Sequence, residues 1–330
     1  MVKAYIITPN YNGLEFLDRF FKSIFKQSYQ NFKLVFVDNS QNDDSIKYIK
    51  KYYPKKLERL VIIKNPENYG FTKANNIGIE VALKDKECEY VICLNNDTEV
   101  KPEFLEELIT SAKKHPYAGS IQAKLIWSQN IKLIDSVGLE YSKNGLGFNR
   151  GAFKLVDTYE DEGEIFGCCA GACLYRRSAL EDIKVNNDYF DGDFFAYYED
   201  VDMAIRLRWA GWTAWFSPKS IVYHYKGGTT GNKSDFTVYH TWRNYTWTLY
   251  KNLPYRYILK NSYLIIACEI SQIIVNLLRR KPIIIRSKIV AYKNLRIFLK
   301  KKKTIKKKVE FKEIEKWFIL RWREETPKNP

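Results

Sequence analysis

The stretch from Tyr90 to Thr98 limits the possible folds more than any other part of the sequence. It begins with an apolar run, Val91–Leu94, which is typical of a strand buried on both faces of a sheet. The polar residues that follow place Asp97 at the carboxyl end of this strand, where open α/β sheets build their sites. A carboxylate there is a suitable ligand for a hard divalent cation. A polar turn that caps the next helix would explain the same residues. The rest of the chain therefore has to distinguish a cation-binding site from a simple turn.

Three similar apolar runs precede this strand, at residues 4–7, 34–37 and 60–63. The segments between them are long enough for helices, and the last helix is predicted from about Thr72 to Leu83. Connections of this length join parallel strands through right-handed crossovers. The predicted fold class is therefore α/β, with a mostly parallel sheet flanked by helices. The first strand–helix turn lacks the G-x-G-x-x-G sequence of dinucleotide-binding folds, which argues against a dehydrogenase.

Polar side chains follow the predicted strands at their carboxyl ends. Asp38 ends the second strand, Asp43 lies in the next loop, and Asn75 and Asn76 lie in the helix after the third strand. In nucleotide sites, an acid at a strand end accepts hydrogen bonds from the ribose or base. Each of these residues is also common in turns and caps. Their appearance after successive strands predicts a ligand site at one edge of the sheet.

A second acidic cluster, Phe190–Asp202, leads into a predicted helix. Asp202 and Arg206 stand four residues apart, so an ion pair on the helix explains Asp202. Glu199 is favoured in the first turn by the helix dipole. Asp200 has the weakest structural explanation, and the aromatic residues before it are suited to the wall of a sugar or base pocket.

His224 is a candidate ligand at the end of a predicted strand. Two short strands are expected, over residues 214–216 and 220–223, and Lys226 follows in a glycine-rich segment. An isolated histidine is more often structural than functional. A histidine at a strand end beside such a segment is a better candidate for binding a metal or a phosphate.

Taken together and in order, these motifs resemble glycosyltransferase family 2, an inverting class with the nucleotide-diphospho-sugar transferase (GT-A) fold. The matching segments are Thr8–Asn12, Val37–Ser45, Asn65–Phe71 with Asn75–Gly78, Leu94–Thr98 and Tyr198–Arg206. The segment Asn65–Phe71 resembles the subgroup that includes rhamnosyltransferases, and Asn95–Asp97 occupies the position of the family's metal-binding D-x-D motif. Several motifs in one order are more specific than any single motif.

The resemblance implies transfer of a sugar from a nucleotide-diphosphate sugar to an acceptor hydroxyl, in the assembly of a cell-surface polysaccharide or glycolipid. It implies that Asp200, with Glu199 beside it, is the catalytic base. It implies that Mg²⁺ or Mn²⁺ is held by Asp97, His224 and Asn95. The implied donor contacts are Thr8, Pro9, Asn10, Tyr11, Asp38, Asp43, Asn68, Gly70, Asn75, Asn76, Asn95, Asn96 and Lys226. Asn95 replaces the expected acid, so the cation would bind chiefly together with the nucleotide.

The C-terminal part of the chain differs in charge from the rest. Residues 251–330 contain 22 Lys and Arg and 6 Asp and Glu. The difference of +16 equals the net charge of the whole chain, so the first 250 residues are neutral overall. We therefore predict a GT-A catalytic domain over residues 1–250, with a donor-nucleotide half (1–100) and an acceptor half (101–250), and a basic amphipathic helical region over 251–330. Basic amphipathic helices beside the lysine run Lys300–Lys303 predict attachment to an anionic membrane surface. The expected acceptor is a saccharide or a lipid-linked saccharide. Packing on the catalytic domain is the alternative.

Two other functions are compatible with parts of the sequence. A nucleotide-sugar-binding protein with weak or no transfer activity would explain Asn95, and a nucleic-acid-binding protein could use the Lys-rich tail. No nucleic-acid-binding motif appears, so no nucleic-acid partner is expected. The six cysteines form no C-x-x-C pair, and the chain shows no signal peptide. The expected location is cytoplasmic, or peripheral on the inner face of the cell membrane.

Overall fold

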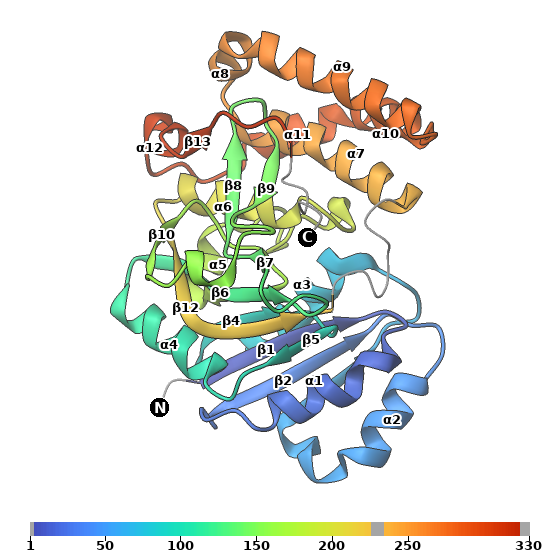
Figure 1. Ribbon diagram of the computed structural model, residues 1–330, viewed down its shortest axis with the longest axis vertical. Coiled ribbons are helices and arrows are strands. Elements are labelled where there is room, and N and C mark those ends of the chain that lie inside the picture. The colour runs from blue at the N-terminus through green and yellow to red at the C-terminus, as the bar shows by residue number, and fades with distance from the viewer. Residues whose placement is uncertain (1–2, 226–233, 324–330) are drawn as a thin grey trace.

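The computed structural model describes residues 3–225 and 234–323, so Lys226, an expected donor contact, lies outside the described residues. Figure 1 shows a central sheet with helices on both sides and, above it in this view, a second layer that is mostly helical. Within the described part of the chain, no helix has both the length and the apolar character needed to cross a lipid bilayer.

The central sheet combines a parallel half with a mixed half. Its strands are β1 (Lys3–Asn10), β2 (Phe32–Asp38), β3 (Leu60–Lys64), β4 (Cys88–Leu94), β5 (Thr98–Val100), β6 (Ala118–Trp127), β7 (Ile134–Ser136), β10 (Gly163–Ile165), β11 (Ala172–Arg176) and β12 (Thr213–His224). Strands β3, β2, β1 and β4 are parallel neighbours in that order. β11 lies antiparallel between β4 and β6, and β6 continues to β12 and β10. The predicted α/β class with a mostly parallel sheet is confirmed.

Helices cover both faces of this sheet. They are α1 (Leu17–Ile24), α2 (Asp44–Tyr52), α3 (Gly70–Lys84), α4 (Phe104–Lys114), α5 (Arg177–Asp182) and α6 (Glu199–Trp209). Successive residues of a strand point to opposite faces. Ile6 of β1 therefore joins a core with Phe20 and Phe104, whereas Ile7 joins a separate core with Ala74. Burial on both faces is the reason why the parallel strands are continuous apolar runs in the sequence.

The predicted elements of the first 100 residues are confirmed: the four apolar runs are β1 to β4, and the helix predicted over residues 72–83 is α3. The prediction of two short strands between residues 214 and 223 was wrong, because β12 is continuous from Thr213 to His224. Its register against β6 shifts between Ser217 and Ile221. Pro218 lies in this interval and has no N–H for the ladder, so the pairing is interrupted while the strand continues.

The second layer brings the C-terminal part of the chain against its middle. It contains α7 (Asp235–Asn252), α8 (Tyr255–Lys260), α9 (Ser262–Leu278), α10 (Ile283–Lys293), α11 (Leu295–Lys302), α12 (Phe311–Glu315) and a small sheet of β13 (Phe318–Ile319), β8 (Leu139–Ser142) and β9 (Gly147–Asn149). β13 pairs in parallel with β8. Trp247 of α7 stacks on Phe298 of α11, with ring centroids 4.2 Å apart. The division of the chain into domains at residue 250 stays a prediction.

Candidate active site

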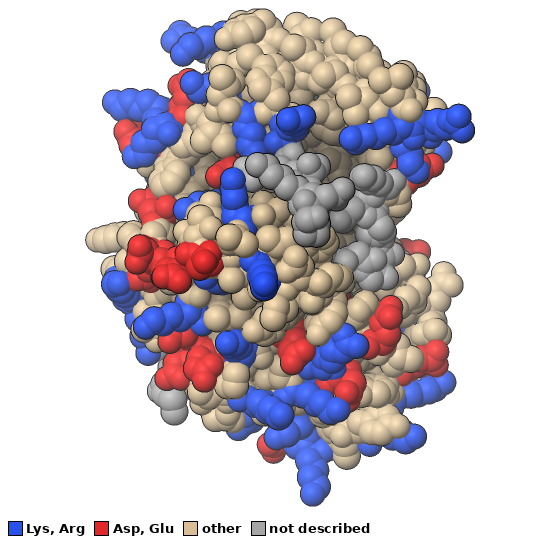
Figure 2. Space-filling model, in the orientation of Figure 1, with Lys and Arg blue, Asp and Glu red and all other residues tan. Residues whose placement is uncertain are grey.

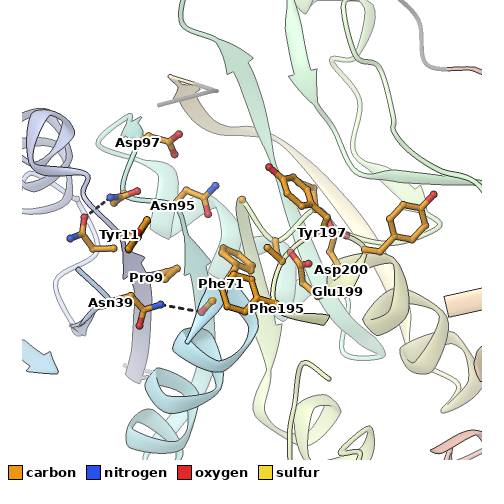
Figure 3. A pocket seen from close by; sticks show the side chains of 18 of the residues that line it. Pro9, Tyr11, Asn39, Phe71, Asn95, Asp97, Phe195, Tyr197, Glu199 and Asp200 are labelled. Carbon is orange, nitrogen blue, oxygen red and sulfur yellow. Dashed lines mark hydrogen bonds between the residues drawn. The ribbon is translucent and has the colours of Figure 1, made fainter. Parts of the chain in front are cut away.

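A cavity of about 640 Å³ opens at the carboxyl ends of β1, β2 and β4, the edge where the sequence predicts a ligand site. Figure 3 shows its two walls. Tyr11 and Asn39 lie on one side, Glu199 and Asp200 lie on the other, and Asn95 lies between them. The cavity therefore brings together loops that are far apart in the sequence.

Most of the expected site residues contribute to this cavity. Those that line it are Pro9, Asn10, Tyr11, Asn68, Gly70, Asn95, Asn96, Asp97, Glu199, Asp200 and His224. Five other expected donor contacts do not line it: Thr8, Asp38, Asp43, Asn75 and Asn76. The surroundings of these five residues show where their side chains lie instead.

Asp38 lies behind the cavity wall and is fully buried. Its Oδ1 accepts hydrogen bonds from Asn10 Nδ2 at 2.8 Å and from the backbone N–H of Ser40 at 3.1 Å. Its Oδ2 accepts a hydrogen bond from Lys64 Nζ at 3.1 Å. Asn10 Oδ1 in turn accepts from Asn96 Nδ2 at 2.6 Å. The carboxylate thus fixes the amide of Asn10, which joins the ends of β1 and β2 to the loop after β4.

The other four residues are also outside the cavity. Asp43 is exposed on the surface, with 60% of its side chain accessible. Asn76 connects α3 to the first residue of the second acidic cluster, because Asn76 Nδ2 donates to Phe190 O at 2.7 Å and Asn76 Oδ1 accepts from Phe190 N at 2.9 Å. The Oδ1 of Asn75 and the hydroxyl of Thr8 are buried without a hydrogen-bond partner among the described residues.

The amide of Asn39 connects β2 to the loop after β3. Its Nδ2 donates to Asn68 Oδ1 at 3.3 Å and to the carbonyl of Gly70 at 3.1 Å. Asn68 Oδ1 also accepts from the Gly70 N–H at 2.9 Å. Gly70 has φ of +79°, a conformation that a residue with a side chain rarely adopts. Asn39 was not among the expected contacts, although it directly follows Asp38 in the sequence and lines the cavity.

His224 stands between two carboxylates. Its Nε2 lies 3.3 Å from Asp97 Oδ1, and its Nδ1 lies 2.7 Å from Asp135 Oδ2. Burial lowers the pKa of His224, but the charge of Asp97 and the hydrogen bonds to both acids raise it to about 10. This end of the cavity therefore favours positive charge. Asp135 of β7 was missed by the sequence analysis, since no motif surrounds it.

The donor set at this end suits a hard divalent cation. Asp97 supplies a carboxylate, His224 supplies a ring nitrogen, and Asn95 Oδ1 is a buried acceptor with no hydrogen-bond partner among the described residues. Asp135 on the far nitrogen of the ring is the arrangement that commonly orients a metal-binding histidine. The part of the chain that the structure describes contains no group of three acidic, His or Cys side chains already gathered for a metal. A cation here would rely on Asn95 and on ligands from a bound substrate.

Glu199 and Asp200 begin α6 on the opposite wall. Burial and the neighbouring charge of Asp200 raise the pKa of Glu199 well above its usual value. Burial also raises the pKa of Asp200 to about 6, although the N–H groups of Val201 and Ala170 favour its charged form. Val201 N donates to Asp200 Oδ1 at 2.8 Å. The surroundings of this pair therefore favour the protonated form of Glu199 more strongly than that of Asp200.

The segment before these acids has a strained backbone. Phe195, Tyr197 and Tyr198 have φ of 66°, 69° and 67°. Each such residue costs on the order of 1 kcal/mol, so the conformation persists only where neighbouring groups impose it. Asn244 of α7 is such a group, because its Nδ2 lies 2.9, 2.9 and 2.7 Å from the carbonyl oxygens of Phe194, Ala196 and Tyr197. The expected aromatic wall is present, but its backbone geometry had no signal in the sequence.

Known proteins resemble this chain in sequence. Residues 5–184 match the family model described as glycosyl transferase family 2. An N-acetylglucosaminyl-diphospho-decaprenol L-rhamnosyltransferase of Mycobacterium tuberculosis is 26% identical over 245 residues, which cover 68% of this chain and 77% of that protein. Rhamnosyltransferase WbbL of Escherichia coli K12 is 27% identical over 184 residues, which cover 53% of this chain and 67% of that protein.

Solved structures share the fold at lower sequence identity. The structure of GalNAc-T7 with UDP, GalNAc and Mn²⁺ has a TM-score of 0.59 and 15% identity, and the match covers 86% of this chain and 58% of that one. The structure of residues 1–349 of S. aureus TarS in complex with UDP has a TM-score of 0.51 and 17% identity, and the match covers 80% of this chain and 69% of that one. These structures and the family match identify the GT-A fold. The chain therefore belongs to glycosyl transferase family 2, and it is a glycosyltransferase.

Proposed function

We propose that this glycosyltransferase moves a sugar from a nucleoside-diphosphate sugar to an acceptor hydroxyl, with inversion at the anomeric carbon. One observation carries the proposal. A single cavity holds Asp97 and His224 at one end and Asp200 on the opposite wall. The first end attracts a cation and the diphosphate, and the second supplies a base whose pKa of about 6 suits proton transfer near neutral pH.

The nucleotide half of the donor lies against the first wall. Pro9 and Tyr11 offer apolar and aromatic surface, and the amides of Asn39 and Asn68 offer hydrogen bonds. Asp38 acts through Asn10 rather than by direct contact, because its oxygens already accept bonds from the protein. It is a positioning residue in this proposal.

A divalent cation, Mg²⁺ or Mn²⁺, would be held by Asp97, by Asn95 Oδ1 and by His224 Nε2 once this nitrogen has lost its proton. The short contact of Asp135 with His224 Nδ1 keeps the ring in place for this role. When bound, the cation neutralises the charge that develops on the diphosphate as the sugar leaves. Because the side chain of Asn95 is neutral, ligands from the donor itself would complete the site.

Asp200 takes the proton of the acceptor hydroxyl. The acceptor oxygen forms a bond to the anomeric carbon while the bond from that carbon to the diphosphate oxygen breaks, so one displacement inverts the centre. Glu199 keeps its own proton because burial and the charge of Asp200 raise its pKa. The single negative charge of the pair therefore stays on the base.

The relatives support a narrower class of substrates. Two of them are named as rhamnosyltransferases, and the name of the mycobacterial protein includes an N-acetylglucosaminyl-diphospho-decaprenol. We extend this to an L-rhamnosyl or similar hexosyl donor and to a lipid-linked saccharide acceptor in the assembly of a polysaccharide or related glycan.

The variant Asp200→Asn tests the proposal. We expect transfer to fall by at least roughly a hundredfold, because the amide cannot accept the hydroxyl proton. Donor binding should persist, since Asp200 faces the acceptor side. Transfer is measured by release of the nucleoside diphosphate in the presence of acceptor. Binding is measured by the shift in thermal unfolding that a nucleotide sugar produces with Mn²⁺.

Asp161→Asn is the matched control, because Asp161 is exposed and does not line the cavity. It should leave both readouts unchanged. Full transfer activity in Asp200→Asn would remove Asp200 from the role of base. Loss of the thermal shift in the same variant would place Asp200 on the donor side instead.

A further inference from the structure

Helix α9 presents apolar side chains to solvent. Tyr263, Ile266, Ile270 and Ile274 recur at helical spacing, and they are exposed to 67, 57, 52 and 51%. Leu278 at the end of the helix is exposed to 79%. A surface helix of a globular protein normally turns such a stripe toward the core. In α9 the apolar stripe faces solvent instead of the core.

The opposite face of α9 directs polar groups into the protein. Glu269 forms an ion pair with Lys288 of α10 at 2.8 Å and accepts a hydrogen bond from Thr246 of α7 at 3.3 Å. Asn276 and Ile265 of the same helix are buried. Polar contacts thus fix the helix in its orientation, so the outward apolar face is a defined feature of the packing.

The apolar face continues on the neighbouring helices, and both α8 and α10 contact α9. Further exposed apolar side chains are Tyr255 and Leu259 of α8, Ile285, Ile289 and Tyr292 of α10, and Ile297 of α11. Figure 2 shows a largely uncharged surface over α8 and α9 at the top of the molecule, with Lys and Arg at its sides. Exposed apolar patches with a charged rim mark contact sites for proteins or membranes.

The charge around this face has one sign. From Lys251 to Val309 the sequence contains 17 Lys and Arg and a single acid, Glu269, whose side chain is 13% exposed. Lys301 and Lys302 of the Lys-rich run are themselves buried, so this run is not a continuous basic strip. The exposed cations without an acidic partner among the described residues include Arg256, Arg279, Arg280, Arg286, Lys293 and Arg296. An apolar face bordered by such cations is complementary to an anionic lipid surface.

We propose that α8 to α11 dock this chain on an anionic lipid bilayer, with α9 lying in the plane of the surface. Docking itself does not depend on the proposed function. Its consequence, access to a lipid-linked acceptor, does rest on that function. α10 packs on α7, and Phe236 of α7 lines the catalytic cavity, so the docked helices adjoin the site. A second copy of the chain is a poorer occupant, because face-to-face pairing would bring two basic rims together.

Vesicle flotation tests the apolar part of the surface. The vesicles contain phosphatidylcholine alone or phosphatidylcholine with phosphatidylglycerol, and neither donor nor acceptor is added. The wild-type chain is expected to float with the anionic vesicles only. A triple variant, Ile266→Gln, Ile270→Gln and Ile274→Gln, should reduce binding at least roughly tenfold. The matched control replaces Leu57, Ile131 and Leu155 by Gln, which are exposed to 40, 62 and 54% on other surfaces, and should bind like the wild type.

A second set of variants tests the charge. Arg279→Gln, Arg280→Gln and Arg286→Gln together should weaken binding to anionic vesicles, and added salt should weaken binding of the wild type. The control is Lys47→Gln, Lys50→Gln and Lys55→Gln in and after α2, at the other end of the molecule (Figure 1). Thermal unfolding of every variant shows whether it is folded.

The outcomes separate docking from catalysis. Wild-type protein that stays unbound, or α9 variants that float like the wild type, would overturn the proposal. A dimer in sedimentation that the α9 substitutions dissociate, with no vesicle binding, would assign the face to a second copy. Nucleotide release with a water-soluble acceptor is measured in parallel. If the proposed function is wrong, no nucleotide is released but the protein still floats with the vesicles. If docking is wrong, nucleotide is released but the protein does not float.

Discussion

At the scale of single residues, the neighbouring acids Glu199 and Asp200 differ because their surroundings differ. Both residues line the cavity, but Glu199 Oε2 is buried with no hydrogen-bond partner among the described residues, whereas Asp200 accepts a hydrogen bond from the Val201 N–H. Burial raises both pKa values, and the charge of Asp200 raises that of Glu199 further. Proton binding is therefore favoured more at Glu199 than at Asp200, which is the difference that the proposed role of Asp200 as base would require.

This difference predicts the pH dependence of transfer. A base must be deprotonated, so the rate at saturating donor should rise with pH, pass its half-maximum near the Asp200 pKa of about 6, and then level off. The measurement is a pH–rate profile of nucleotide release at saturating metal and acceptor. Glu199→Gln mimics the protonated acid, so the midpoint should stay near 6 in that variant. A profile that shows no such rise, with release limited by chemistry, would contradict the role of Asp200.

Gly70 gives a second prediction at this scale. A Cβ at this position would lie 2.7 Å from the backbone oxygen of Phe195, and φ is +79°. Gly70→Ala should therefore destabilise the fold by at least about 1 kcal/mol and raise the KM for the donor, because the loop after β3 must move. Gly163→Ala is the control, since a Cβ there meets no atom within 4 Å. Equal unfolding temperatures of the two variants would show that the loop adapts freely.

At the scale of elements, α7 holds the strained segment that leads to Glu199 and Asp200. Arg243 Nη2 donates to the carbonyl of Phe194 at 2.7 Å, next to the contacts of Asn244 with the same segment. Phe195 stacks on His240 of this helix, with ring centroids 5.2 Å apart. The backbone conformation near Asp200 is therefore determined by a helix that follows it by about 40 residues in the sequence.

Replacing Asn244 by Leu tests whether the contacts of Asn244 with this segment maintain its conformation. The side chain is similar in size but cannot donate, so three carbonyl oxygens lose a partner. We expect kcat to fall more than the KM for the donor changes, because the segment carries the acceptor side of the cavity. Asn261→Leu is the control. Asn261 is also buried, but its Nδ2 donates only to Tyr257 within its own stretch of chain. A loss of donor binding with unchanged kcat would argue against this role of Asn244.

At the scale of the whole molecule, local patterns predicted the parallel half of the sheet and most of the cavity lining. The apolar runs that became β1 to β4 are short and are buried on both faces, so sequence and structure agree there. Asp97, Asp200 and His224 could be found because each lies at the end or start of a regular element. The structure brings these three residues into one cavity.

Structural features that depend on contacts between distant parts of the chain could not be predicted from local sequence patterns. Asp135 reaches His224 only because β7 pairs with β6, and β6 pairs with β12. The inward direction of Lys301 depends on Asp191 and Asp193, which lie far back in the sequence. A run of lysines is typical of a solvated surface, so the sequence alone could not separate the buried members from the exposed ones.

The same distant contacts argue against an independent catalytic domain over residues 1–250. Lys251 forms ion pairs with Asp191 at 2.7 Å and with Asp202 at 2.8 Å, and Lys301 pairs with Asp191 from the other side. Burial alone would raise the pKa of Asp191, but the two lysines lower it. A cut after residue 250 would remove both lysines and leave Asp191 buried and unpaired, which is strongly destabilising, whereas Asp202 would keep its ion pair with Arg206.

A chain that ends after Asn252 should therefore fail to form a cooperative fold. It keeps Lys251 but loses Lys301, the stacking of Phe298 on Trp247, and the pairing of β13 with β8. Apolar core is then exposed, and Asp191 keeps only one of its two lysine partners. The expected result is aggregation in gel filtration and loss of the near-ultraviolet circular dichroism of the aromatic core. Co-expression of residues 253–330 as a separate chain should restore part of the soluble protein, because the missing contacts can then form between two chains. A soluble truncated chain with one sharp unfolding transition would show instead that the catalytic domain folds by itself, as the charge division in the sequence suggests.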